Sequence, residues 1–166
     1  MKIHIIGCSG TGKTYLAKAL AQKYGIPHYD LDGLMWDNSG GYGVKRDKAE
    51  RNAMLCEILT KPDRITEGVY YAWVGDCFED ADVIYLLDIP PRVYKPRIIR
   101  RHLRRRLGIE KGRKETFKSV CDLLRWTDKF QRENMVEIKK ILRKYESKVI
   151  VIKSAREMDK VIWTKR

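Results

Sequence analysis

Short apolar runs alternate with helical segments along the 166 residues of this chain. The first run, residues 2–6 (KIHII), stops at Gly7, and such a continuous run is typical of a buried parallel strand. Four more strands are predicted over residues 26–31, 64–67, 82–88 and 148–152. The clearest is 82–88 (DVIYLLD), with a near-continuous apolar run, and the third strand of the chain is expected to stop at Gly68.

Helical spacing of apolar residues fills the segments between these runs. The helix over 13–24 is predicted to stop at Gly25, and Ser154 with Glu157 forms a capping box for a last helix. Strands that alternate with helices predict one α/β domain, residues 1–166, whose parallel sheet is covered by helices on both faces. The remaining helices are predicted over 46–60, from Pro91 to about Leu107, and over about 116–145.

Composition narrows the class of protein. An apolar share of 43% suffices for one core, and no apolar run approaches the roughly 20 residues that span a bilayer. The four cysteines lack metal-ligand and redox spacing, which predicts a reduced, cytoplasmic protein. Cys8 is interpreted as a small filler residue, with an accessible thiol as the alternative. The net charge of +13 favours an anionic partner, and ATP, a phosphorylated substrate and nucleic acid all qualify.

A glycine-rich loop between the first strand and the first helix carries the most specific signal. Its glycines let the backbone approach phosphate closely, and the N–H groups at the start of the helix attract anions. Lys13 is predicted to reach the β- and γ-phosphates of ATP as a catalytic residue, and the Thr14 hydroxyl is predicted to ligate Mg²⁺. The loop matches G-x-x-x-x-G-K-[ST] in full, which makes all eight residues candidates for binding ATP: Gly7, Cys8, Ser9, Gly10, Thr11, Gly12, Lys13 and Thr14.

Two carboxylates, Asp30 and Asp32, are predicted to end the second strand beside this loop. Alternation along a strand places both side chains on one face. A carboxylate there can hold Mg²⁺ through water or accept a proton from a hydroxyl acceptor. Asp32 is therefore a candidate catalytic and metal residue, and both aspartates are candidates for binding the acceptor. The alternative is a turn-forming pair before Gly33.

The chain resembles the nucleoside-monophosphate-kinase group, which includes adenylate and shikimate kinases, and looks closest to the small adenylate-kinase-like proteins called DNA topology modulation proteins. The resemblance implies a three-layer P-loop NTPase fold with a five-stranded parallel sheet of order 2-3-1-4-5. It implies ATP and Mg²⁺ as cofactors and transfer of the γ-phosphoryl group of ATP to a small acceptor. The matching stretches are Gly7–Thr14, His28–Asp32 with Trp36, Thr66–Tyr70, Asp82–Pro90, and Leu123–Trp126 running on to Arg132.

The same resemblance implies a mobile substrate-binding segment, about residues 33–61, and a basic lid region, about residues 97–132. At the end of the third strand, it implies that Gly68 lets the acceptor approach the backbone and that Glu67 helps to hold the metal. The alternative for this pair is a strand-terminating turn.

Lid arginines are the remaining candidates. Residues 92–118 contain twelve Lys or Arg, most of which are expected on solvated helix faces. The resemblance implies that a few close over the transferring phosphoryl group and neutralise its charge, and Arg97 and Arg132 are the preferred catalytic candidates. Arg125 lies seven residues before Arg132, on the same helix face, and is a candidate for binding the substrate.

The sequence therefore predicts an ATP-dependent kinase of a small molecule, with nucleotides and nucleosides ahead of other hydroxyl compounds. One alternative is an ATP-binding regulator that contacts nucleic acid, although no established DNA-binding motif is present. A second alternative is an ATP-hydrolysing switch without an acceptor. The expected partners are ATP and a small acceptor, with no membrane, in a monomer or dimer.

Overall fold

The computed structural model describes residues 1–37, 44–109 and 116–164. Five parallel strands form one sheet in the order β2-β3-β1-β4-β5, which confirms the predicted order. Each predicted strand is present with bounds shifted by at most two residues: β1 (Lys2–Gly7), β2 (His28–Asp30), β3 (Arg64–Gly68), β4 (Val83–Leu87) and β5 (Val149–Ile152).

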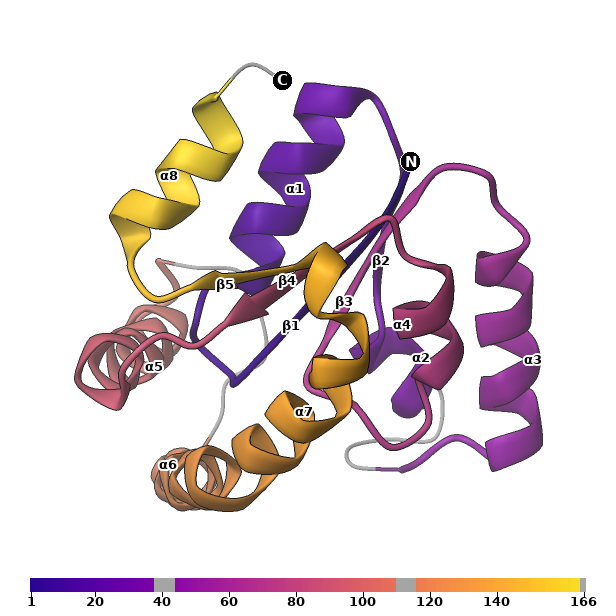
Figure 1. Ribbon diagram of the computed structural model, residues 1–166. Helices are drawn as coiled ribbons and strands as arrows, with labels where there is room; N and C mark the ends of the chain where they lie inside the picture. Colours follow the sequence, from indigo (N-terminus) through magenta and orange to yellow (C-terminus); the bar gives the residue numbers. More distant parts are fainter. Residues whose placement is uncertain (38–43, 110–115, 165–166) are drawn as a thin grey trace.

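Helices cover both faces of the sheet (Figure 1). The helices α1 and α8 lie side by side on one face, and α4 and α7 lie on the other. No helix of the described residues is long and apolar enough to cross a membrane. The bounds are α1 (Lys13–Tyr24), α2 (Asp32–Met35), α3 (Lys48–Leu59), α4 (Gly75–Asp80), α5 (Pro91–Arg106), α6 (Phe117–Lys129), α7 (Met135–Leu142) and α8 (Ala155–Trp163), with a π-helical turn over Phe130–Asn134 and a 3₁₀ segment over Arg143–Lys148.

The central strand β1 lies between β3 and β4, and its side chains Ile5 and Ile6 are fully buried. All five residues of β3 are buried as well. Continuous burial explains why β1 is a near-continuous apolar run rather than an alternating pattern, whereas β3 buries the polar side chains of Arg64, Thr66 and Glu67. The centre of the sheet therefore gives a rigid base to the loops that leave its carboxyl edge, where α/β proteins place their ligands.

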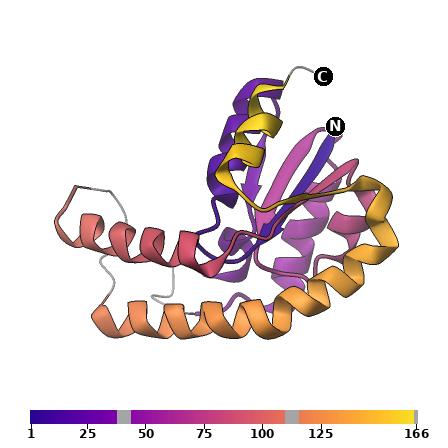
Figure 2. The same cartoon turned by 60° about the vertical axis from the view of Figure 1, so that its left-hand side comes forward.

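The helices α5 and α6 form an arm that extends beyond the sheet (Figure 2). They pack against one another, and α5 buries Tyr94, Ile98 and His102, which recur every four residues along one face. The α5–α6 arm includes most of the predicted lid region and begins six residues before it, at Pro91; residues 110–115 of that region lie outside the described residues.

Three predicted details are wrong. Asp32 does not end a strand but begins the short helix α2, because the Asp30 carboxylate accepts a hydrogen bond from the Asp32 N–H (2.9 Å) and ends β2 there. The helix predicted over about 116–145 changes to a π-helical turn at Phe130–Asn134 and becomes 3₁₀ from Arg143. The short helix α4 was not predicted. Residues 38–43 of the predicted substrate-binding segment lie outside the described residues.

Candidate active site

The phosphate loop joins β1 to α1, and two of its glycines are required by its geometry. Gly12 has φ 102°, in the left-handed region that favours glycine. At Gly7, an added Cβ would lie 2.8 Å from the carbonyl oxygen of Leu87 on the neighbouring strand. These constraints hold the loop tightly against the sheet while its N–H groups stay at the start of α1.

Inside the loop, the carbonyl oxygen of Cys8 accepts hydrogen bonds from Thr11 Oγ1 (2.8 Å) and Lys13 Nζ (3.0 Å). The Cys8 side chain is fully buried, and burial raises the pKa of its thiol to about 11. Cys8 is therefore an inert filler, as interpreted from the sequence, and the alternative of an accessible thiol is wrong.

Lys13 is the buried cation of the site. Burial lowers the pKa of its ammonium group, while the negative charges of Glu67 and Asp32 oppose that shift. The hydrogen bond that Lys13 Nζ donates to the Cys8 carbonyl oxygen stays within the loop itself, so a phosphate oxygen can take over this donor without a change of fold.

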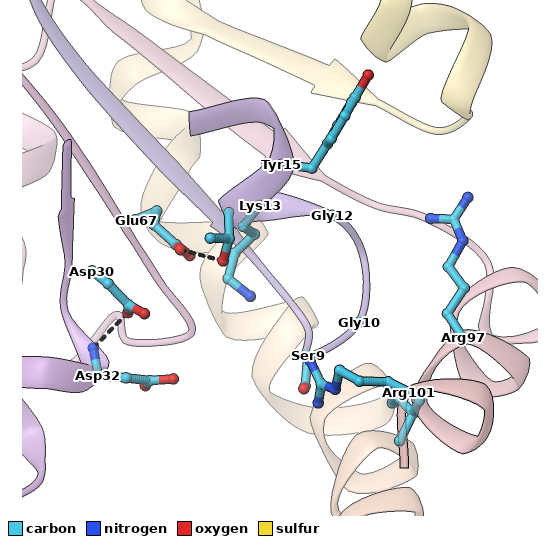
Figure 3. Close-up of a pocket in the computed structure, with 12 residues that line it drawn as sticks. Ser9, Gly10, Gly12, Lys13, Tyr15, Asp30, Asp32, Glu67, Arg97 and Arg101 are labelled. Carbon is cyan, nitrogen blue, oxygen red and sulfur yellow. Dashed lines mark hydrogen bonds between the residues drawn. The ribbon is translucent and has the colours of Figure 1, made fainter. Parts of the chain in front are cut away.

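A cavity of about 240 Å³ opens at the carboxyl edge of the sheet and brings most of the candidates together (Figure 3). Loop residues form one side, carboxylates form a second and α5 forms a third. The lining residues are Ser9, Gly10, Gly12, Lys13, Thr14, Tyr15, Asp30, Asp32, Glu67, Arg97, Ile98 and Arg101.

Glu67 at the end of β3 is the most buried carboxylate of the cavity. Its Oε1 accepts a hydrogen bond from Thr14 Oγ1 (2.5 Å) and lies 3.6 Å from His28 Nε2. Burial raises the pKa of Glu67, but His28, Lys13 and the Thr14 hydroxyl together outweigh burial and hold it below its usual value. Glu67 is therefore ionised at neutral pH.

The two aspartates face the phosphate loop from the other side (Figure 3). Burial raises the pKa of Asp30, with a further contribution from the nearby carboxylates of Glu67 and Asp32. Asp32 Oδ1 accepts a hydrogen bond from the Tyr70 hydroxyl (2.6 Å), which fixes the direction of this carboxylate. The turn-forming alternative is correct in part, since the Asp30 carboxylate accepts a hydrogen bond from the Asp32 N–H. Both aspartate side chains also line the cavity.

The side-chain oxygens and negative charges that line the cavity decide whether it suits Mg²⁺. The Thr14 hydroxyl and three carboxylates line the cavity, and oxygen ligands are those that Mg²⁺ prefers. Within the described residues, no group of three or more His, Cys, Asp or Glu could hold a metal ion by itself. The residues therefore fit a Mg²⁺ ion that arrives with phosphate oxygens and keeps part of its water shell, rather than a metal held by protein alone.

Arginines reach the cavity from α5. Both Arg97 and Arg101 line it, and Figure 3 shows Arg101 extending to the loop at Ser9. Arg125 and Arg132 are exposed and do not line the cavity. The π-helical turn that contains Arg132 changes the side-chain register, so the spacing of seven does not by itself place the two on one face. Arg125 instead pairs with Asp122 (3.2 Å). Their predicted roles stay predictions.

Gly68 also lies outside the cavity lining. A Cβ there would lie 3.2 Å from the Leu31 Cβ and from Tyr70 Cδ2, so the glycine lets β3 pack against the segment that carries Asp30 and Asp32. Its predicted contact with the acceptor stays a prediction.

Four residues around the cavity received no individual role from the sequence. Arg101 was one of several arginines at the start of the predicted lid, and helical spacing alone could not separate it from its neighbours. Tyr70 and His28 fall in stretches that match the resembled family, and Tyr15 follows the loop motif directly. The positions of His28 and Tyr70 relative to the cavity depend on the pairing of β2 with β3, which no local pattern reveals.

The sheet order, the strand–loop–helix motif and the cavity at its edge define a P-loop NTPase fold. Residues 3–67 match the family model described as "ATPase family associated with various cellular activities (AAA)". This segment runs from β1 through Glu67 and includes the phosphate loop and both aspartates.

Solved small-molecule kinases share this fold at low sequence identity. The shikimate kinase from Bacteroides thetaiotaomicron superimposes with a TM-score of 0.56 at 19% identity, covering 98% of this chain and 94% of that one. The shikimate kinase from Aquifex aeolicus gives 0.54 at 17%, covering 98% and 91%. A gluconokinase from Sinorhizobium meliloti gives 0.53 at 15%, covering 97% and 86%.

One curated protein of Bacillus subtilis (strain 168), the uncharacterized protein YqaC, is 30% identical over 104 residues. The match covers 62% of this chain and 57% of that protein, so the aligned part spans just over half of the relative's length.

Proposed function

We propose that the protein is an ATP-dependent kinase that transfers the γ-phosphoryl group of ATP to a small acceptor carrying a hydroxyl or phosphate group. The observation that carries the proposal is one cavity lined both by a phosphate loop with a buried lysine and by two aspartates that face the loop. The carboxylates opposite the loop can hold Mg²⁺ through water and can also accept a proton from a hydroxyl acceptor, which is the role that a kinase adds. The shikimate kinase and gluconokinase that share this fold agree with the proposal.

The cavity residues can take separate roles during phosphoryl transfer. The loop N–H groups and Lys13 bind the β- and γ-phosphates, and Arg97 and Arg101 meet the charge that builds on the transferring group. Thr14 and the neighbouring carboxylates would hold Mg²⁺ when it is bound with ATP, and the ion would neutralise part of the phosphate charge. Because the transition state is loose, positioning and electrostatics supply most of the rate.

Asp32 is the proposed base for a hydroxyl acceptor. The acceptor oxygen forms a bond to the γ-phosphorus as the bond from that phosphorus to the bridging oxygen of ADP breaks, and the hydroxyl proton passes to the Asp32 carboxylate. The hydrogen bond from Tyr70 holds Asp32 Oδ1, which leaves the other carboxylate oxygen to face the acceptor. The products are ADP and the phosphorylated acceptor.

A panel of acceptors tests the proposal. ADP release from ATP and Mg²⁺ is measured with nucleoside monophosphates, nucleosides, sugar acids and small hydroxyl acids, and with Lys13→Ala as the control. Turnover that depends on one acceptor class and disappears in the control is the expected result. Turnover that no acceptor stimulates, with ATP still bound, contradicts the kinase proposal.

The basic arm favours a second candidate, an ATP-binding regulator that contacts nucleic acid. The helix α5 carries eight Lys or Arg among its sixteen residues, and Arg92, Arg100 and Arg106 are exposed. Such a surface attracts phosphate backbones. Sub-micromolar DNA binding whose affinity falls steeply with salt would support this candidate. If the protein does not bind DNA at physiological salt, the nucleic-acid candidate is excluded.

A further inference from the structure

One buried polar atom beside the active site has no role in the proposed transfer. His28 Nε2 is buried and makes no hydrogen bond within the described residues, yet it lies 3.6 Å from Glu67 Oε1. That separation is just beyond hydrogen-bond range. The same Glu67 oxygen accepts a hydrogen bond from Thr14 Oγ1, with 2.5 Å between the two oxygens. His28, Glu67 and Thr14 therefore form a chain that runs from the first residue of β2 to the phosphate loop.

We propose that His28 is a positioning residue that holds Glu67 in place, so that the Thr14 hydroxyl oxygen is presented to a Mg²⁺ ion bound with the nucleotide. The proposal rests on the proposed function only in requiring that this site bind nucleotide together with Mg²⁺. It does not depend on the identity of an acceptor, or on transfer taking place.

The hydrogen-bonding capacity of Thr14 explains why Glu67 matters for the metal. A hydroxyl has one proton and two lone pairs, so a Thr14 that donates its proton to Glu67 keeps its lone pairs for a cation. If Glu67 were free to turn, the Thr14 hydroxyl could point its proton into the cavity and repel the ion. The direction of this one carboxylate therefore decides which side of the hydroxyl faces the metal.

His28 is placed to fix that direction. The side chains of Glu67 and His28 are 3% and 15% exposed, so bulk water does not compete strongly for the Glu67 oxygen. With the ring proton on Nε2, a movement of a few tenths of an ångström converts the 3.6 Å separation into a hydrogen bond.

His4 provides a matched control within the same sheet. It is also a buried strand histidine, and its Nδ1 lies 2.8 Å from Thr66 Oγ1, one residue before Glu67. Neighbouring residues of a strand point to opposite faces, so Thr66 faces away from the side on which Glu67 meets Thr14. A change at His4 tests the effect of losing a buried histidine bond without touching the chain to Thr14.

The experiment measures the affinity of a fluorescent ADP analogue with excess Mg²⁺ and with EDTA. The ratio of the two affinities is the Mg²⁺ gain. We expect His28→Leu to lower the gain about tenfold, while affinity in EDTA changes less than twofold. His28→Gln, whose amide N–H reaches the position of Nε2, is expected to restore most of the gain, whereas the shorter His28→Asn is not. His4→Gln is expected to lower thermal stability and leave the gain unchanged.

Three results would overturn the proposal: a His28→Leu protein with the full Mg²⁺ gain, an equal loss of affinity with and without Mg²⁺, or a loss that adds independently to that of Glu67→Gln. In the Glu67→Gln background, His28→Leu is expected to have no further effect on the gain, because the two residues act through one contact. If the His28→Leu protein does not fold, the comparison of His28→Gln with His28→Asn tests the proposal by itself. A protein that binds nucleotide with the predicted pattern and phosphorylates nothing refutes only the kinase proposal.

Discussion

The phosphate cavity and the α5–α6 arm both carry basic residues, but they hold them in opposite ways. Lys13 is buried, and Glu67 and Asp32 stabilise its charge. On α5, by contrast, the arginines are spread around the helix, and only Arg97 and Arg101 line the cavity. The difference teaches that the number of basic residues says little about function here, and that position relative to the phosphate loop decides which of them can act on a phosphoryl group.

The largest expected effect separates a buried lysine from an exposed one. Lys13→Ala is expected to lower turnover about 10²–10³-fold, because a fixed donor to the transferring phosphate is lost from a site with little water. Lys18→Ala on the exposed side of α1 is the control and is expected to keep turnover within twofold. ADP release at saturating ATP measures both. Equal effects of the two changes would contradict the assignment of the cavity as the site of transfer.

The next effect concerns the fit of the loop against the sheet. Gly7→Ala is expected to destabilise the protein by about 1–3 kcal/mol, because the new methyl group meets the Leu87 carbonyl and Cβ with no room to move. Gly33→Ala is the matched control, since a Cβ there has no neighbour within 4 Å. Urea unfolding compares the two variants. A Gly7→Ala protein as stable as the wild type would mean that the loop does not need this close approach.

Substituting arginines of the predicted lid region is expected to have a smaller effect, which distinguishes an arginine that lines the cavity from one that does not. Arg101→Ala is expected to lower kcat about tenfold, through lost stabilisation of charge in the transition state. Arg132→Ala, at an exposed position away from the cavity, is expected to change kcat less than threefold. Steady-state kinetics with the acceptor found in the panel measures both variants. The reverse ranking would support the sequence-based preference for Arg132 and would require the arm to rearrange during turnover.

The smallest effect is a dependence of stability on pH that originates beneath the cavity. Burial lowers the pKa of His4 from 6.5 to about 3, so the folded state keeps this ring neutral while the unfolded chain protonates it. The stabilisation is fully present above pH 6.5 and is lost as pH falls toward 3. Between pH 6.5 and 5.5 it should fall by about 1 kcal/mol.

Urea unfolding at the two pH values measures this loss, and His4→Gln should remove it. A wild-type protein whose stability stays constant over the interval would show that His4 is not held neutral by the fold.

The sequence predicted the central part of the fold because the local pattern and the final environment agree there. Continuous apolar runs became the buried strands β1 and β4, and the loop motif fell between a strand and a helix as expected. Agreement of this kind is strongest where burial on both sides of the sheet dictates the residues.

Elsewhere, the outcome depends on contacts between distant segments. The π-helical turn at Phe130–Asn134 has no marker in a pattern of helical spacing, and it changes the register from which a shared face of Arg125 and Arg132 was predicted. The roles suggested for Tyr70 and His28 follow from their meeting Asp32 and Glu67 across the sheet edge. Such pairings are fixed by strand register, which a single sequence does not reveal.

The most direct test of the kinase proposal follows the phosphoryl group itself. ATP labelled in its γ-phosphate is incubated with the protein, Mg²⁺ and each acceptor, and the labelled products are separated. The proposal predicts that label moves to an organic acceptor and that Lys13→Ala abolishes this transfer. Label that appears only as inorganic phosphate, at a rate unchanged by every acceptor, would contradict the proposal and favour an ATP-hydrolysing switch.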